Sequence, residues 1–223
     1  MLEPKEVEVD EYLAETAYEL CDNIVNYYRD GDGTDFHYIP ALAAMSCLAG
    51  EMVFRSVHNL KDMQAKLYDE LFVLSDEVNK VIAEDPEKPT VYDCVSLLAM
   101  QAGAQEADFP DWNAILEKSL EVMTQGRLMP ELPLEEDQYP FDLPLGFCAE
   151  TRKATDLFFK ERDVQNRDEK VLVLAIAVGS LIQAIDEKNI YSMKQLLEIA
   201  FLIINFSAKV IPFDENYKDK LGL

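Results

Sequence analysis

The residues best placed to do chemistry in this 223-residue chain are Glu51, Arg55 and His58, which fall on one predicted helix. At spacings of i, i+4 and i+7 the three side chains share one helical face. If that face borders a cavity, the carboxylate and the guanidinium orient the imidazole or bind a polar ligand. If it faces water, it is an ordinary amphipathic face whose ion pair contributes little free energy. The sequence leaves both interpretations open.

Three aspartates form the nearest approach to a metal-binding motif: Asp30, Asp32 and Asp35, in the sequence Asp-Gly-Asp-Gly-Thr-Asp. They lie between two predicted helices, as the ligands of a calcium loop would. An EF-hand also needs ligands at its first and twelfth positions, which here are Tyr28 and Ile39. The segment is therefore expected to be a turn that ends one helix and begins the next, with weak calcium binding as the alternative.

Motifs of the common enzyme classes are missing from the sequence. It contains two histidines, His37 and His58, and no GxSxG, P-loop, GxGxxG, HExxH or ExxH string. Multi-histidine metal centres, serine hydrolases and nucleotide-binding enzymes therefore have no support. We expect no cofactor, and we favour a binding protein over an enzyme, although catalysis does not require a motif.

The charge balance points to the class of partner. Forty-three acidic residues against 20 basic ones give a formal charge of -23, while 49% of residues are hydrophobic, a fraction typical of folded chains. Such a surface repels nucleic acid and anionic lipid and attracts basic proteins. We expect a protein partner, either a second copy or a basic protein, and neither nucleic acid nor a membrane. A nucleic-acid-mimicking inhibitor, which needs a contiguous stripe of carboxylates, is a further alternative.

The N-terminus and the cysteines predict a cytoplasmic protein. The first ten residues carry three glutamates where a signal peptide has a basic start and an apolar run. The four cysteines are isolated from one another and are expected to be reduced core thiols: Cys21, Cys47, Cys94 and Cys148.

Apolar residues recur at helical spacing along the chain, which predicts a mainly α, single-domain bundle of seven or eight helices over residues 1–223. Residues 67–82 are the ambiguous segment: we expect a helix, with a small β-hairpin near 66–74 as the alternative. In the second case Ser75 or Asp76 caps a shorter helix. The other expected helices are 9–29, 40–58, 90–102, 111–126, 147–161, 168–187 and 191–210.

An acidic, proline-rich loop over residues 127–145 divides the predicted helices. Its four prolines exclude regular structure, and loops of this length are usually functional or linkers. Tyr139 and Phe141 of the loop, with Trp112 nearby in the sequence, form an aromatic set rimmed by carboxylates, which suits a partner surface. The alternative is that these aromatic residues plug the base of the bundle.

Two glycine-containing helices are expected at the centre of the bundle. Gly50 follows a run of small residues that lets backbones approach closely, and Gly179 lies 129 residues later. This offset suggests a duplicated three-helix unit in which the two helices pair about a pseudo-twofold axis. Further short matches between the halves join residues 12–16 to 147–151 and residues 80–82 to 209–211.

Residues 75–79 (Ser-Asp-Glu-Val-Asn) and 91–105 resemble a segment of uncharacterised bacterial hypothetical proteins. The resemblance covers about thirty residues. It implies a bacterial origin, and it carries over no functional residue because that family has no assigned activity.

The sequence thus favours a soluble, acidic helical protein that acts by protein–protein interaction. The alternative is an enzyme or small-ligand-binding protein with a polar pocket between the Gly50 and Gly179 helices. Glu51, Arg55 and His58 would line that pocket.

Overall fold

The computed structural model describes residues 4–5, 7, 10–29, 36–66, 70–140 and 143–213. Within these ranges the protein is mainly helical, as predicted. Short elements are a π-helix, η1 (Lys80–Glu84), and two 3-10 turns, η2 (Glu106–Asp108) and η3 (Glu136–Gln138). The described α-helices are α1 (Glu11–Tyr27), α2 (Tyr38–Val57), α3 (Leu60–Gln64), α4 (Asp76–Asn79), α5 (Val91–Gln101), α6 (Trp112–Thr124), α7 (Pro144–Glu161), α8 (Arg167–Asp186) and α9 (Met193–Ser207).

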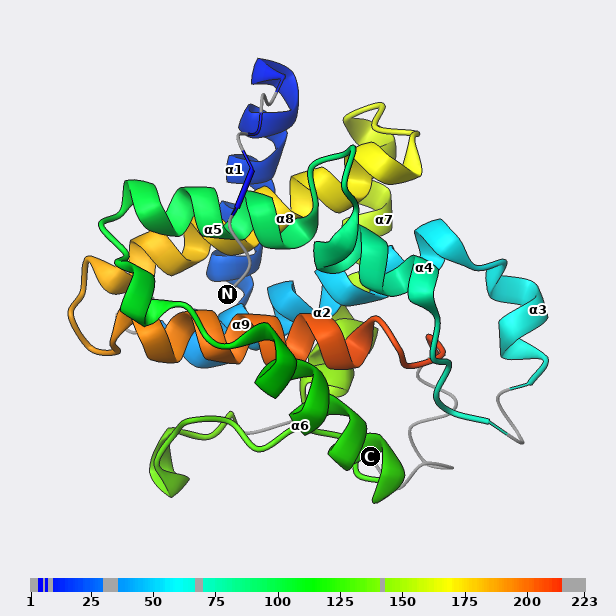
Figure 1. The fold of residues 1–223 in the computed structure, drawn as a ribbon. Helices are drawn as coiled ribbons and strands as arrows, with labels where there is room; N and C mark the ends of the chain where they lie inside the picture. Colours follow the sequence, from blue (N-terminus) through cyan, green and yellow to red (C-terminus); the bar gives the residue numbers. More distant parts are fainter. Residues whose placement is uncertain are drawn as a thin grey trace.

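Two long helices, α2 and α8, pack against each other at the centre of the molecule (Figure 1). α2 also packs against α7 and α9, and α8 packs against α1 and α5. Every residue of α2 from Ile39 to Phe54 is buried, and one hydrophobic cluster joins the long helices. No helix in the described ranges is long and apolar enough to cross a membrane.

The two glycines of the central helices face different partners. A Cβ atom at Gly50 would lie 2.9 Å from the backbone nitrogen of Ala208, and closer still to the carbonyl oxygen of Ile204 in α9. A Cβ atom at Gly179 would lie 2.6 Å from Cδ1 of Leu98 in α5. Each glycine therefore permits a close helix contact. The expected pairing of α2 with α8 is present, but the glycines do not form it.

The duplicated three-helix unit stays a prediction. The central helices have comparable neighbours, since α2 packs on α7 and α9 while α8 packs on α1 and α5. Residues 80–82, however, lie in the π-helix η1, whereas residues 209–211 follow the end of α9. This pair of matching segments therefore does not mark equivalent elements.

Local capping explains where several helices begin. The Thr90 hydroxyl accepts a hydrogen bond from the Asp93 N–H, and the Asp93 carboxylate accepts one from the Thr90 N–H. This reciprocal pair of hydrogen bonds is a capping box at the start of α5. α7 begins at Pro144 rather than at Phe147, because proline suits the first helical position. α9 begins only at Met193, after a capping box formed by Ser192.

The helix expected over residues 67–82 is wrong in its first half. Residues 67–69 lie outside the described ranges, and residues 70–75 are not helical. The turn of the alternative hairpin includes Asp69 and so also falls outside them. Ser75 caps the short helix α4, as that alternative predicted.

The non-helical segment pairs with residues far away in the sequence. The Val73 N–H donates to the Lys209 carbonyl at 2.8 Å, and the Ile211 N–H donates to the Leu71 carbonyl at 2.9 Å. These backbone hydrogen bonds form an antiparallel bridge between Phe72 and Val210, directly after a turn at residues 208–209. They explain why α9 ends at Ser207 rather than near Val210.

The proline-rich loop packs against the bundle. Leu132 is buried, and the Tyr139 hydroxyl accepts from the Leu132 N–H at 3.1 Å and donates to its carbonyl at 2.9 Å. Gln195 of α9 donates to the Pro133 carbonyl at 3.2 Å. We expected no regular structure over 127–145. This expectation is wrong at η3 and at the first residues of α7, which lie within that range.

Candidate functional site

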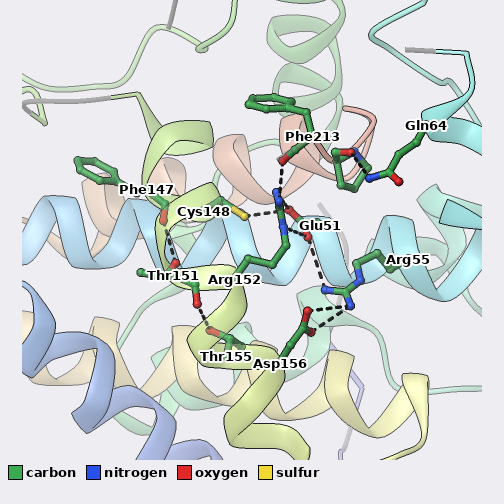
Figure 2. Close-up of polar contacts among 11 residues, drawn as sticks. Glu51, Arg55, Gln64, Phe147, Cys148, Thr151, Arg152, Thr155, Asp156 and Phe213 are labelled. Carbon is green, nitrogen blue, oxygen red and sulfur yellow. Dashed lines mark hydrogen bonds and ion pairs between the residues drawn. The ribbon is translucent and has the colours of Figure 1, made fainter. Parts of the chain in front are cut away.

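A buried ion-pair cluster centred on Glu51 joins α2 to α7 (Figure 2). Glu51 is only 5% exposed. Its carboxylate accepts hydrogen bonds from Nε of Arg152 at 2.6 Å and from Nη2 at 2.5 Å, a bidentate geometry that strengthens the pair. Nη1 of Arg152 also donates to the Phe213 carbonyl at 2.5 Å. One guanidinium therefore ties α2, α7 and the segment after α9 together.

Arg55 extends this cluster toward the surface. Its Nη1 lies 3.6 Å from Oε1 of Glu51, and its Nη2 lies 3.0 Å from Oδ1 of Asp156. The predicted proximity of Glu51 and Arg55 is confirmed, although they face another helix rather than an open cavity or water. The space beside Glu51 and Arg152 has a volume of about 10 Å³, enough for about one water molecule. The space beside this ion-pair cluster is therefore too small for a ligand larger than about one water molecule.

The thiol beside the cluster is not a nucleophile at neutral pH. Cys148 donates a hydrogen bond to Oε2 of Glu51 at 3.1 Å. Its hydrogen bond with Cys47 and its burial raise the pKa of Cys148 well above the usual value, so the reactive thiolate is not formed. Burial lowers the pKa of Arg152, but the Glu51 carboxylate raises it more, and the net pKa lies above the usual value. All four cysteines are buried and free, as predicted.

His58 does not join Glu51 and Arg55. α2 ends at Val57, and His58 adopts an extended conformation with φ -107° and ψ 152°. Its ring packs against Phe54 with the ring centroids 4.7 Å apart. The predicted stripe is therefore wrong at its third position, because the helix that would align it has ended.

His58 instead lines a cavity of about 600 Å³. The cavity lies between the end of α2, α4, α6 and the residue Lys209, and its volume falls within the range of about 300–1,000 Å³ typical of small-molecule sites. Burial lowers the pKa of His58, so its imidazole is neutral at pH 7, and its buried Nε2 has no hydrogen-bond partner in the described structure. The other lining residues are Leu74, Ser75, Asp76, Glu77, Asn79, Leu116 and Leu120.

Lys209, in the wall of this cavity, is a residue that sequence reasoning missed. It is 3% exposed, and its Nζ donates to Oδ1 of Asn205 at 2.9 Å and to the Asn205 carbonyl at 3.3 Å. Burial lowers the pKa of Lys209 to about 8, although Glu84 opposes this shift. The sequence feature that could have identified Lys209 is its position as a single lysine within the mainly apolar segment 201–211.

A second hollow lies between α1 and α7 and has a volume of about 270 Å³. We call it the α1–α7 groove. Its volume is below the range of about 300–1,000 Å³ typical of small-molecule sites, so it suits individual side chains of a partner better than a whole ligand. The residues that line it are Leu20, Asn23, Ile24 and Tyr27 of α1, and Glu150, Thr151, Ala154, Thr155, Leu157, Phe158 and Glu161 of α7.

The predicted aromatic partner surface is not formed as expected. Trp112 is buried and packs edge-to-face on Tyr92 with ring centroids 5.8 Å apart. The prediction that Trp112 lies on an exposed partner surface is therefore wrong. Tyr139 is half-buried and holds the loop through Leu132. Phe141 lies outside the described residues.

The predicted calcium ligands Asp30, Asp32 and Asp35 also lie outside the described residues. Among the residues that are described, no group of three or more His, Cys, Asp or Glu side chains is placed to hold a metal ion.

Comparison of the chain with protein-family models, with curated proteins and with solved structures found no match. The resemblance of residues 75–79 and 91–105 to bacterial hypothetical proteins stays a prediction. Two features of the fold itself, the α1–α7 groove and the cavity beside Lys209, therefore carry the functional proposals.

Proposed function

We propose that this protein binds a basic, amphipathic helix of another protein in the α1–α7 groove. The observation that supports this function is an apolar hollow between two helices with acidic side chains at its edge. An amphipathic helix that lays its apolar face into such a hollow is a recurrent mode of protein recognition.

Large apolar side chains stand exposed at the groove. Tyr27 is 59% exposed and Leu157 is 54% exposed, while Ile24 and Phe158 line the groove further in. Covering such side chains gains roughly 25 cal/mol for each Å² of apolar surface removed from water. Binding in the groove would bury Tyr27 and Leu157 together, because they lie on its two facing helices.

The charge of the chain selects the partner class. Glu150 and Glu161 line the groove, and the whole chain carries a formal charge of -23. A second copy would bring the same negative charge, so that repulsion opposes self-association. A helix with Lys or Arg on its polar face is attracted instead, which raises its association rate and fixes its orientation. We therefore favour a basic protein over a second copy.

Replacing Leu157 by Ser is expected to weaken binding of a synthetic helix with Leu on one face and Lys on the other by about five- to tenfold. The reason is loss of apolar contact at the groove. Fluorescence anisotropy of the labelled peptide measures the affinity, and circular dichroism checks that the variant is folded. Ile190→Ser is the matched control, because Ile190 is 55% exposed and is not among the groove residues.

Four outcomes would contradict the proposed function. Equal weakening by Ile190→Ser would mean that binding is not confined to the groove. Tight binding of the same peptide with Glu in place of Lys, or binding insensitive to salt, would remove the charge argument. A dimer that Leu157→Ser dissociates in analytical ultracentrifugation would make a second copy the occupant.

A further inference from the structure

We propose that Lys209 forms a reversible imine with a small, neutral aldehyde that occupies the cavity beside His58. The cavity and the α1–α7 groove share no lining residue, so this activity is independent of the proposed protein binding. Three features support it: the placement of Lys209 in the cavity wall, the orientation of the lone pair on its amine, and the chemistry of the neighbouring side chains.

The amine of Lys209 is held in a defined orientation. Its Nζ donates to Oδ1 of Asn205 at 2.9 Å and to the Asn205 carbonyl at 3.3 Å. A neutral amine has two N–H bonds and one lone pair, so these two acceptors occupy both N–H bonds. The lone pair is then directed away from Asn205. A lysine that usually samples many rotamers is thereby preorganised as a nucleophile.

Burial favours the reactive form of this amine. With a pKa of about 8 for Lys209, about one-tenth of the amine is neutral at pH 7, whereas an ordinary lysine with a pKa of about 10.4 is neutral in fewer than about one molecule in a thousand. Charged or titratable groups at the cavity are Asp76, Glu77 and His58, and Glu84 acts on Lys209 from η1. Negative charge at Glu84 favours the ammonium form, but burial outweighs it.

The reaction needs no oxidant or reductant. The Nζ lone pair attacks the carbonyl carbon, and the electrons of the broken C=O π bond move to oxygen, which takes a proton to give a carbinolamine. Loss of the hydroxyl group and of the remaining N–H proton as water leaves the C=N bond. The neutral imidazole of His58 lines the same cavity, but its Nε2 is enclosed, so solvent water carries the proton from nitrogen to oxygen.

The walls of the cavity indicate the class of aldehyde. Leu74, Leu116 and Leu120 supply an apolar surface, which suits an aliphatic or aromatic body. Asp76 and Glu77 line the same cavity and repel a ligand that carries a carboxylate. The structure therefore favours a neutral aldehyde over an aldehyde or keto acid with a negative charge.

Reductive trapping tests the proposal on the unmodified protein. Benzaldehyde with cyanoborohydride converts each imine to a stable secondary amine, and peptide mass spectrometry gives the rate at each lysine. We expect Lys209 to be labelled at least about tenfold faster than Lys88, whose side chain is 70% exposed. With 4-carboxybenzaldehyde the rate at Lys209 is expected to fall at least about tenfold relative to Lys88, because the carboxylates of the cavity repel this probe.

Two controls separate a cavity reaction from chance reactivity. In urea the preference for Lys209 should vanish, because it depends on the folded cavity. Leu120→Glu places a charge on the cavity wall at a position that is already 40% exposed. This variant should slow labelling of Lys209 and leave Lys88 unchanged, whereas Leu157→Glu in the α1–α7 groove should change neither rate.

Slower labelling of Lys209 than of Lys88 in the folded protein would overturn the proposal, since it would mean that the amine only caps the end of α9. Equal labelling by the two aldehydes would overturn the assignment to a neutral ligand. Neither result bears on the groove, because the peptide assay tests different residues.

Discussion

Replacing Arg152 by Met is expected to lower the free energy of unfolding by about 3–5 kcal/mol. The substitution removes the two hydrogen bonds that Arg152 donates to the Glu51 carboxylate and its hydrogen bond to the Phe213 carbonyl, and it leaves the one from the Cys148 thiol. Glu51 stays buried, and its nearest remaining guanidinium is that of Arg55 at 3.6 Å. A buried carboxylate without a close partner is costly, because the charge has lost its water and gained nothing in exchange. Urea unfolding followed by circular dichroism at pH 7 measures the change.

Arg55→Met is the matched control for this prediction. Its guanidinium is partly exposed and farther from Glu51, so its removal is expected to cost about 1 kcal/mol or less. The double variant Glu51→Leu, Arg152→Met should recover much of the lost stability, because it leaves no unpaired charge in the interior. If Arg152→Met is as stable as the parent, the ion pair does not hold α2 to α7.

Replacing Gly50 by Ala is expected to destabilise the protein by about 1–3 kcal/mol. The added Cβ atom would lie 2.9 Å from the backbone nitrogen of Ala208 and closer to the carbonyl oxygen of Ile204. Backbone atoms at the end of α9 cannot rotate aside, so the two helices must separate. Separation loses dispersion contacts along the whole interface of α2 with α9. Urea unfolding again gives the change.

Gly179→Ala provides the comparison within the same fold. The nearest atoms to the added Cβ atom would be side-chain atoms of Leu98, with Cδ1 at 2.6 Å and Cβ at 2.9 Å. Cδ1 can move aside by a change of rotamer, but Cβ is fixed by the backbone, so α5 must also shift slightly. Because alanine favours the helix by about 1 kcal/mol over glycine, Gly179→Ala should destabilise the protein less than Gly50→Ala. Equal losses at Gly50 and Gly179 would show that backbone contact is not what distinguishes the two sites.

Local sequence determined where much of the helical structure begins. Thr90 and Asp93 form a capping box at the start of the helix expected over 90–102, and Asp111 caps the helix expected over 111–126. Each of these interactions joins residues at most three positions apart, so its geometry follows from the helix itself. The periodicity of apolar residues likewise predicted a mainly helical protein, because the helical repeat is a local property of the backbone.

Only the tertiary structure decided which side chains meet. Glu51 pairs with Arg152 on another helix, although its sequence neighbour Arg55 was the partner that spacing indicated. Periodicity predicts which face of a helix is buried, but it does not specify which other helix covers that face. The same reason explains the burial of Trp112, which was expected at a partner surface and packs on Tyr92 instead.

The cavity beside Lys209 shows most directly which features depend on tertiary packing rather than on local sequence. His58 leaves the stripe of Glu51 because α2 ends one residue earlier, a boundary that the sequence placed at His58 itself. Lys209 reaches the same cavity because residues 71–73 pair with the chain after α9 and fix the turn in which Lys209 lies. Backbone hydrogen bonds between segments so distant in the sequence depend on how the helices between them pack. The sequence by itself therefore determined the mainly helical class of the fold and the acidity of the chain, whereas packing decided the groove, the cavity and the residues that line them.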